Sequence, residues 1–491
     1  MAKVAGRSRT VYFCRECGHE SSRWMGFCPS PICGSPQPLA EGTAVPASPG
    51  RFPAPSGTQV PRTGWVGATG GEALELSELS ADSQTRVTLP SSELNRVLGG
   101  GVVPGSVSLL TGEPGVGKST LLLQLAHSLA SAAGVSGAAQ VGGPVLYVSG
   151  EESPMQVKLR AQRMGIEGQG ILLLAQTDID AILEQLDQKQ PGLVIIDSIQ
   201  TLHTDSESSG PGSVGQVREC GLRLLRWAKT QGKPVFLSGH MTKDGALAGP
   251  RVLEHMVDVV LHLEPQESGS YRVLRAAKNR FGSTDEAGVF QMTERGMDDV
   301  PDPSRALLSQ RAGPQLGAIA TPVLAGSRAL LLEVQALTNF SQLPAPRRVA
   351  NGVDYNRLIM LTAVATRRAG LELAGQDVIV NVAGGFRATE PASDLAIILA
   401  VASCYRNAPL PPAAAFGEVG LSSELRTVPQ AQRRVNEAAR LGIARCILPS
   451  ASVPEIETPP GIRLIGAETV GHAIRAAMAP PADELERMFA E

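Results

Sequence analysis

A glycine-rich run in the first half of the chain has the residue types and spacing of a phosphate-binding loop. It fits GxxxxGK[ST] without a gap and consists of Gly112, Glu113, Pro114, Gly115, Val116, Gly117, Lys118, Ser119 and Thr120. In such a loop, backbone N–H groups and a helix N-terminus surround the phosphates, the lysine neutralises the β and γ oxygens, and the serine ligates Mg²⁺. The flanking runs SVSLLT and STLLLQLAHSLA indicate the strand and the helix that this chemistry requires. We predict ATP and Mg²⁺ binding here; a glycine-rich turn without nucleotide is the alternative.

Two carboxylate positions follow strand-like runs downstream of the loop. The run LVIIDS places Asp197 where a carboxylate can hold Mg²⁺, usually through water. Glu151 and Glu152 follow the run VLYVSG, and a carboxylate there can orient and deprotonate the attacking water. The alternative is a solvated acidic helix start, because glutamate is favoured in a first turn. We predict that Glu151 is the catalytic base.

A basic segment follows the strand-like run YRVLRAA. It reads KNRFG, that is Lys278, Asn279, Arg280, Phe281 and Gly282. Two cations one residue apart at a strand end can project to one side and reach phosphates, either of DNA or of a nucleotide in a neighbouring subunit. Taken alone, the segment favours the alternative of a solvated basic turn.

Cysteines cluster near the start of the chain. The cluster has the pattern CxxC, ten residues and then CxxxxC, formed by Cys14, Cys17, Cys28 and Cys33. Four thiolates suit tetrahedral Zn²⁺, and the metal would supply the folding energy that so short a segment lacks. The other three cysteines, Cys220, Cys404 and Cys446, lie in apolar runs and are expected in the core.

Length and composition limit the class of protein. The chain has 491 residues, a formal net charge of −3 and 43% apolar residues, which suggests roughly three domains and gives no global signature of nucleic-acid binding. No apolar run reaches the roughly 18 residues of a membrane-spanning helix. The seven cysteines are odd in number and mostly clustered, which favours a metal site in a reducing compartment over disulfides. We expect a cytoplasmic protein that does not enter a membrane.

The order of apolar and polar runs divides the chain into four parts. Residues 1–35 hold the cysteine cluster, and residues 36–73 form a linker rich in proline, glycine, alanine and serine. In residues 74–301, strand-like runs alternate with helical segments, which is typical of an α/β fold with a mostly parallel sheet. A break rich in proline and glycine then precedes residues 316–480, whose strands and helices predict a separate α+β domain.

These motifs together resemble the RadA (Sms) family of bacterial DNA-repair proteins over nearly the whole chain. The resemblance rests on the cysteine cluster, LGGGVVPGSVSLLTGEPGVGKST, YVSGEES, KNRFG, NVAGGFRATEPASDLA and FGEVGLSSELRTVPQAQRR. It implies a RecA-like ATPase that binds single-stranded and branched DNA, assembles as a hexameric ring, and drives branch migration of intermediates made by the recombinase RecA. The family's second cysteine pair is normally CPxC, whereas this chain has CPSPIC, so His19 is an alternative to Cys33 as fourth zinc ligand.

The resemblance also suggests roles for individual residues. It implies that Lys278 and Arg280 act in trans, in a place similar to that of the Lys/Arg pair of replicative ring helicases. His240 lies where RecA-like motors carry a polar sensor of the γ-phosphate, with a structural histidine as the alternative. Residues 204–216 fall where this fold has DNA-binding loops, but they contain no lysine or arginine, which favours a flexible loop.

The last domain resembles the proteolytic domain of Lon, which uses a serine activated by a lysine amine. The last lysine of this chain is Lys278, and arginine is not deprotonated in proteins, so this domain cannot form a Ser/Lys dyad. Ser393 lies near the nucleophile position, and the counterpart of the lysine falls at residues 432–434. We predict a Lon-like domain without protease activity.

Three arginine pairs in this domain are candidates for DNA contacts. If they share one face they can neutralise phosphates, whereas scattered solvated charges are the alternative; the pairs are Arg347 and Arg348, Arg367 and Arg368, and Arg433 and Arg434. We single out Arg347 and Arg348. The leading interpretation of the whole chain is a DNA-dependent, helicase-like ATPase. A signalling or assembly ATPase that does not move along DNA is the first alternative, and a Lon-type protease is the second.

Overall fold

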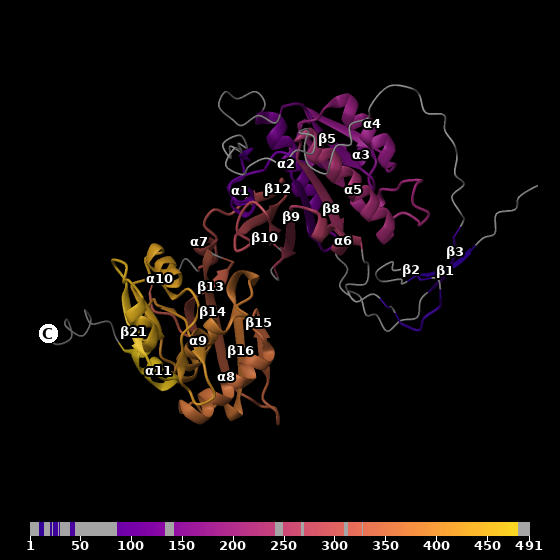
Figure 1. Cartoon of the computed structure of the whole chain (residues 1–491). Coiled ribbons are helices and arrows are strands. Elements are labelled where there is room, and N and C mark those ends of the chain that lie inside the picture. Colours follow the sequence, from indigo (N-terminus) through magenta and orange to yellow (C-terminus); the bar gives the residue numbers. More distant parts are fainter. Residues whose placement is uncertain are drawn as a thin grey trace, which may run out of the picture.

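Two bodies of secondary structure make up most of the molecule. The computed structural model describes residues 9–13, 20–21, 23–27, 29, 40–44, 86–132, 142–240, 249–266, 270–308, 313–326 and 328–479. Figure 1 shows one body in indigo to magenta and the other in orange to yellow, connected by the segment that contains α7 (Pro303–Leu307). Within these ranges, no helix is both long enough and apolar enough to cross a membrane.

The first body contains a sheet of nine strands among the described residues. In spatial order they are β12 (Gly296–Asp299), β11 (Ala287–Thr293), β10 (Tyr271–Asn279), β9 (Val259–Pro265), β4 (Val107–Gly112), β8 (Val235–His240), β7 (Leu193–Asp197), β5 (Val145–Ser149) and β6 (Ile171–Ala175). The strands from β9 to β6 run parallel, while β10, β11 and β12 extend the sheet in antiparallel fashion. Strands β4 and β5 are buried along their whole length, as expected for a parallel sheet covered on both faces. The predicted α/β fold is confirmed, and its antiparallel extension is a finding of the structure.

Helices cover both faces of this sheet. They are α1 (Ser92–Leu98), α2 (Lys118–Ala132), α3 (Pro154–Arg163), α4 (Ile179–Lys189), α5 (Val214–Gln231) and α6 (Gly249–Met256). Apolar side chains of α1, α2 and α3 join one buried cluster, and those of α4, α5 and α6 join another. Local signals set the helix ends. For example, Ser153 caps α3 in a reciprocal box with Gln156, and Gly232 ends α5 at a φ of 64°, which favours glycine.

The second body contains a mixed sheet. Its seven described strands are, in spatial order, β15 (Arg348–Asn351), β16 (Gln376–Val382), β14 (Arg328–Phe340), β13 (Ala318–Ala325), β17 (Ala414–Ala415), β20 (Arg445–Pro449) and β21 (Arg463–Ala467). A small ladder pairs β18 (Glu418–Val419) with β19 (Leu425–Arg426). The helices are α8 (Tyr355–Arg368), α9 (Asp394–Arg406), α10 (Ala431–Arg440) and α11 (Val470–Met478). Helix α9 is buried nearly all round, which makes it the central helix of this body.

The two bodies share buried contacts. Val273 and Val289 of the first sheet pack in one cluster with Val323 and Leu330 of the second. The buried carboxylate of Glu93 on α1 pairs with the Arg328 guanidinium at 3.0 Å. The predicted break rich in proline and glycine contains a short helix, α7 (Pro303–Leu307), which the sequence analysis did not predict. This helix is tied to α10, because Asp302 at its N-terminus pairs with Arg440 and Ser304 donates to Glu437.

Near the N-terminus, three short strands form a sheet in the order β2 (Glu20–Ser21), β1 (Arg9–Phe13) and β3 (Ala40–Ala44). Strand β3 pairs with β1 along its full length. The predicted linker over residues 36–73 therefore begins too early, because its residues 40–44 belong to this sheet. The predicted zinc ligands Cys14, Cys17, Cys28 and Cys33, and the alternative His19, lie outside the described residues.

Candidate functional site

The phosphate loop joins the end of β4 to the start of α2. Its backbone shape depends on glycine: Gly115 and Gly117 have φ values of 77° and 114°, which side-chain-bearing residues rarely adopt. A Cβ on Gly112 would lie 2.5 Å from the carbonyl oxygen of Leu263 on β9. A Cβ on Gly115, by contrast, would meet no atom within 4 Å, so this side of the loop is open. The loop and the helix N-terminus thus have the shape that a chain of phosphates needs.

Lys118 is the first residue of α2 and lies at the centre of the loop. Its Nζ atom donates to the carbonyl oxygens of Gly112 and Glu113 at 3.0 and 3.1 Å and lies 3.1 Å from Nδ1 of His240. Only 4% of the lysine is exposed. Burial lowers its pKa, and the charges of Asp197 and Glu151 oppose this shift. The ammonium group therefore lies in a partly dry, electronegative setting, in which contact with a phosphate is strong.

The two adjacent glutamates have different surroundings. Oε1 of Glu151 accepts a hydrogen bond from the Ser198 hydroxyl at 2.5 Å and lies 3.3 Å from Nε2 of His240. Glu152 instead pairs with Arg160 on α3. Only Glu151 thus belongs to the group of side chains around Lys118, and His240 contacts both of these residues.

Asp197 ends β7, the strand beside β5. The register pairs it with Ser149 of β5. Its Oδ2 atom accepts a hydrogen bond from the buried hydroxyl of Tyr147 at 2.6 Å. Burial, followed by the charge of Asp197, holds the pKa of this phenol well above its usual range. The hydroxyl of Ser119 and the carboxylate of Asp197 are hard oxygen ligands, which fit Mg²⁺ beside a phosphate loop.

Sequence reasoning missed Tyr147 and Ser198. Tyr147 lies two residues before Ser149, so both side chains point to the same face of β5. Two features of the sequence could have indicated Tyr147. One is this alternation along β5, and the other is the run LVIID, which ends in the carboxylate of Asp197. Ser198 directly follows Asp197, and only the fold brings its hydroxyl to Glu151.

The KNRFG turn lies at the opposite edge of the sheet. Asn279 at the end of β10 pairs with Val259, and Val259 pairs with Ser108 near the start of β4. The phosphate loop follows the other end of β4, about 15 Å away at the usual rise of a strand. Lys278 and Arg280 are thus separated from the phosphate loop of their own chain by the length of a strand.

Both cations of this turn have partners at that edge. Lys278 donates to the carbonyl oxygens of Glu254 and His255 at the end of α6, at 2.8 and 3.1 Å. Arg280 lies 3.3 Å from the buried carboxylate of Asp258, which Lys229 of α5 also contacts at 2.6 Å. Burial, and next the charge of Arg280, lowers the pKa of Lys278.

The other residues of KNRFG hold the turn against α1. The Asn279 side chain donates to the carbonyl oxygen of Val97 and accepts from the N–H of Phe281. A Cβ on Gly282 would lie 3.1 Å from the Cα of Gly99, so the two backbones are in close contact. The turn is therefore a fixed structure from which the 56% exposed side chain of Arg280 projects.

Residues 204–216 are internally bonded, in contrast to the predicted flexible loop. The side-chain amide of Gln216 donates to the carbonyl oxygens of Thr204, Glu207 and Ser209, and its oxygen accepts from the N–H of Thr204. The predicted flexibility was wrong because one buried glutamine satisfies four backbone groups of the segment.

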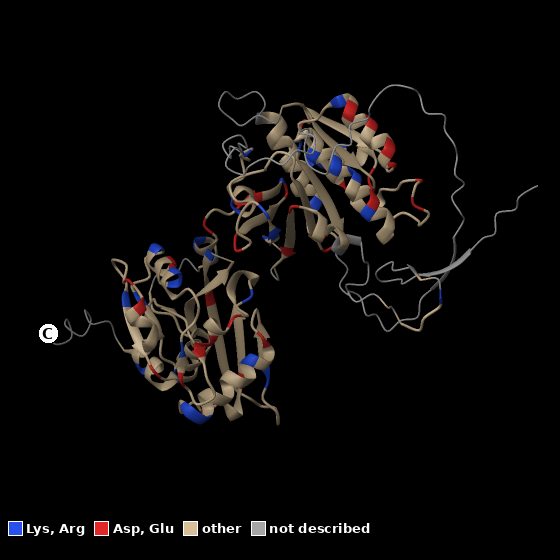
Figure 2. Ribbon diagram, viewed as in Figure 1, with Lys and Arg blue, Asp and Glu red and all other residues tan. Residues whose placement is uncertain are grey.

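The arginine pairs of the second body are not equivalent. The Arg348 guanidinium donates to the carbonyl oxygens of Leu373 and Gln376, whereas the Arg347 side chain is exposed. Arg434 is fully buried and makes two 2.7 Å bonds to Glu390, so it does not offer its charge to a ligand in solution. Arg367, Arg368 and Arg433 are exposed. Figure 2 shows basic and acidic residues interspersed over both bodies.

Ser393 lies at the start of α9 and is 1% exposed. Its hydroxyl donates to the carbonyl oxygens of Ala388 and Glu390 at 3.1 and 2.8 Å. The hydroxyl is thus buried and engaged with backbone, and the guanidinium of Arg434 on α10 pairs with the side chain of the same Glu390.

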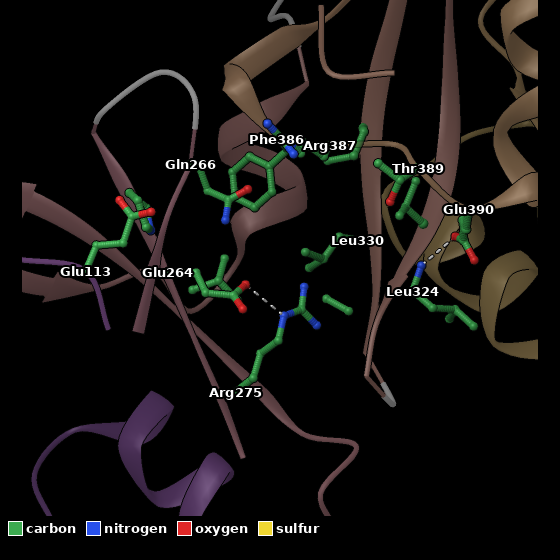
Figure 3. Close-up of a pocket in the computed structure, with 15 residues that line it drawn as sticks. Glu113, Glu264, Gln266, Arg275, Leu324, Leu330, Phe386, Arg387, Thr389 and Glu390 are labelled. Carbon is green, nitrogen blue, oxygen red and sulfur yellow. Dashed lines mark hydrogen bonds and ion pairs between the residues drawn. The ribbon is translucent and has the colours of Figure 1, made fainter. Parts of the chain in front are cut away.

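A cavity of about 630 Å³ lies between the two bodies (Figure 3). Glu113 of the phosphate loop and Glu264 of β9 line one wall, and Thr389 and Glu390 line the other. Arg275 reaches into it and lies 3.6 Å from Glu264. Both carboxylates and guanidinium groups line the cavity. Its charge is therefore mixed and does not favour an anion over a cation.

Comparison with known proteins agrees with this architecture. The model of the AAA domain family matches residues 73–246. The chain is 42% identical to the DNA repair protein RadA of Bacillus subtilis over 96% of this chain and 99% of that protein. It is 45% identical to the DNA repair protein RadA of Pseudomonas aeruginosa over 96% of this chain and 99% of that protein. It is 42% identical to the DNA repair protein RadA of Escherichia coli over 96% of this chain and 99% of that protein.

Proposed function

Because this chain belongs to the RadA family of DNA repair proteins, we propose that it is a DNA-dependent ATPase that processes recombination intermediates as a helicase-like motor. The observation that supports this most directly is the division of charges between the two edges of the nine-stranded sheet. Lys118, His240 and Glu151 gather at the phosphate loop. Lys278 and Arg280 lie at the other edge, about the length of a strand from the phosphate loop of their own chain.

The residues at the loop have distinct proposed roles in hydrolysis. Backbone N–H groups of the loop bind the phosphates, and Lys118 exchanges its contacts with Gly112 and Glu113 for phosphate oxygens. Glu151 orients a water molecule and accepts its proton as that water attacks the γ-phosphate. His240, between Lys118 and Glu151, reports whether the γ-phosphate is present. Ser119 and Asp197 would hold Mg²⁺, which when bound neutralises charge on the β- and γ-phosphates.

The KNRFG turn serves the neighbouring subunit in this proposal. Lys278 and Arg280 reach the nucleotide of the next subunit in a hexameric ring and neutralise charge that develops on its γ-phosphate during hydrolysis. Asn279, Phe281 and Gly282 keep the turn in place against α1. A ring built in this way is active only when each subunit meets its neighbour, which couples hydrolysis to movement along DNA.

The second body binds DNA in this proposal and does not cleave peptides. Among the proposed DNA contacts Arg347 is exposed, whereas Arg348 supports the loop from which Arg347 projects. Burial of Ser393 and pairing of Arg434 with Glu390 support the absence of a working nucleophile and base. Single-stranded and branched DNA and the recombinase RecA are the proposed partners.

Zinc binding by the N-terminal cysteines remains a prediction from the sequence, as does the cytoplasmic location. Four thiolates within residues 14–33 would hold one Zn²⁺ per chain. Metal analysis of the purified full-length protein is expected to find zinc at one equivalent. Replacement of Cys17 by serine should remove it.

The function is tested by measuring ATP turnover without DNA, with single-stranded DNA and with forked DNA, beside a mass measurement of the assembly. We expect DNA to raise the rate and the mass to match a closed ring. Lys118→Ala, which should assemble but not turn over ATP, is the control for contaminating ATPases. An assembly whose rate does not respond to either DNA would instead support a signalling or assembly ATPase.

A further inference from the structure

Two neighbouring strands place a phenol against the carboxylate that ends β7. Tyr147 lies on β5 beside Ile195 of β7, and Asp197 follows two residues later on the same face. The tyrosine is 1% exposed, and its hydroxyl donates to Oδ2 of Asp197 at 2.6 Å. The bond is short because its acceptor is a carboxylate held in place by the end of a strand.

The Tyr147 ring has free space on one side, and Asp197 has few other partners among the described residues. The ring faces an apolar cavity of about 160 Å³, lined also by Leu123, Val157, Ile166 and Leu173. Side-chain packing therefore leaves space on one side of the ring. In the described part of the chain, Asp197 receives no other side-chain hydrogen bond, so the phenol fixes the carboxylate and the carboxylate fixes the phenol.

This arrangement has a consequence for cation binding. A carboxylate at a strand end can rotate about its side-chain bonds, and each rotation moves the oxygen that faces a cation. With Oδ2 held by Tyr147, the carboxylate keeps one orientation, and its charge acts on Lys118 of the phosphate loop. Partners that orient a metal ligand in this way typically change metal affinity by about 10- to 100-fold.

We propose that Tyr147 is a positioning residue that orients Asp197 toward the Mg²⁺ of the bound nucleotide. This inference rests on the proposed role of Asp197 in holding Mg²⁺. It assigns Tyr147 no contact with the nucleotide. Its removal should therefore change the dependence of nucleotide binding on Mg²⁺ and leave the affinity for nucleotide without Mg²⁺ unchanged.

The test uses the full-length protein with Tyr147→Phe, which deletes one hydroxyl and keeps the ring. ADP affinity is measured by calorimetry over a series of Mg²⁺ concentrations and in the presence of a chelator. Mg²⁺ changes the ADP affinity, and half of this change is reached at a certain Mg²⁺ concentration. We expect this concentration to be about tenfold higher for Tyr147→Phe than for wild type. Tyr271→Phe, which removes a hydroxyl from the ring packed on Phe386, is the matched control and should behave as wild type.

Asp197→Asn tests the role of Asp197 in holding Mg²⁺ separately from the role of Tyr147 in orienting Asp197. If Asp197→Asn loses the Mg²⁺ dependence and Tyr147→Phe shifts it, the positioning role is supported. If Asp197→Asn loses it and Tyr147→Phe matches wild type, the positioning role is overturned while the role of Asp197 stands. If Asp197→Asn keeps the wild-type dependence, Asp197 does not hold Mg²⁺ and both assignments are overturned. A fall in ADP affinity in the chelator that matches the fall with Mg²⁺ would show only a structural role for Tyr147 and would also overturn the inference.

Discussion

The two edges of the nine-stranded sheet hold their cations in different ways. At the phosphate loop, Lys118 contacts one ring nitrogen of His240, and Glu151 contacts the other. At the opposite edge, Lys278 contacts the carbonyl oxygens at the end of α6, and Arg280 lies beside Asp258. The first edge has one lysine within a group of polar side chains, whereas the second has two cations that bond to the end of α6 and to Asp258.

This difference indicates that the loop edge binds a ligand, whereas the KNRFG edge offers its cations to a second molecule. The loop edge leaves its polar groups bonded mainly to one another, so a phosphate can replace these contacts without breaking the fold. At the KNRFG edge, hydrogen bonds to α1 and α6 fix the turn, and the side chain of Arg280 stays 56% exposed. A rigid cation at the far edge is useful to a second molecule whose own phosphate loop lies against it.

The largest effect should follow from Lys118→Ala. This change removes the ammonium group of the loop lysine, and ATP turnover should fall by about 100-fold or more, with or without DNA. Turnover is measured on the purified assembly, whose mass should be unchanged. Residual turnover near the wild-type rate would mean that the loop edge is not the catalytic edge.

The next largest effect concerns the far edge. Lys278→Ala should bind nucleotide as wild type does but lose the DNA-stimulated part of its turnover, because the lost charge serves a neighbouring site. Nucleotide affinity and DNA-stimulated rate are measured on the same preparation. Intact stimulation in this variant would contradict the trans-acting role.

A mixture of two inactive variants sharpens this test. Mixed assemblies of Lys118→Ala and Lys278→Ala contain interfaces in which an intact loop faces an intact KNRFG turn. DNA-stimulated turnover should therefore return on mixing. Mixed assemblies that form but stay inactive would show that both residues act within one chain.

A smaller effect is expected on stability from Asp258→Asn. Its carboxylate is 3% exposed and pairs with Lys229 and Arg280, so its neutralisation leaves a partly buried lysine without a counter-ion. The free energy of unfolding should fall by about 3 kcal/mol, measured from the urea midpoint with tryptophan fluorescence as a probe. Glu264→Gln, which breaks an exposed pair with Arg275, is the control and should cost about 0.5 kcal/mol. If both variants lose the same free energy of unfolding, the pairs of Asp258 stabilise the fold no more than an exposed ion pair does.

The smallest effect is a pH dependence of nucleotide binding. Burial lowers the pKa of Lys118, so as the pH rises this lysine loses its proton before an ordinary lysine does. ADP affinity should therefore weaken toward alkaline pH, by about tenfold once the charge is gone. Calorimetry between about pH 7 and pH 10 measures it. Lys278→Ala should keep this alkaline loss and Lys118→Ala should not; an equal loss in both would assign it to another group.

Local patterns predicted much of the fold. The runs VLYVS and LVIID became β5 and β7, and the run STLLLQLAHSLA became most of α2. These predictions succeeded because apolar patterns act over a few neighbouring positions. The β1–β3 pairing and the short α7 were missed because they depend on partners distant in the chain or in another body.

The candidate site divides along the same line. Spacing alone identified Lys118, because a phosphate loop is built from consecutive residues. Arg434, in contrast, looked like a surface cation in the sequence, and the fold buried it against Glu390. No local pattern reveals such a change, because it depends on a residue 44 positions away.

The sequence by itself determined the phosphate loop, the alternation of strands and helices in residues 74–301, and the absence of lysine after Lys278. Only the tertiary structure decided that Tyr147 bonds to Asp197, that Glu151 rather than Glu152 lies beside His240, and that KNRFG lies at the far edge from the loop. The reason is physical. Strand and helix formation depends on neighbours along the chain, whereas the edge of a sheet at which a side chain lies depends on the direction and register of strand pairing.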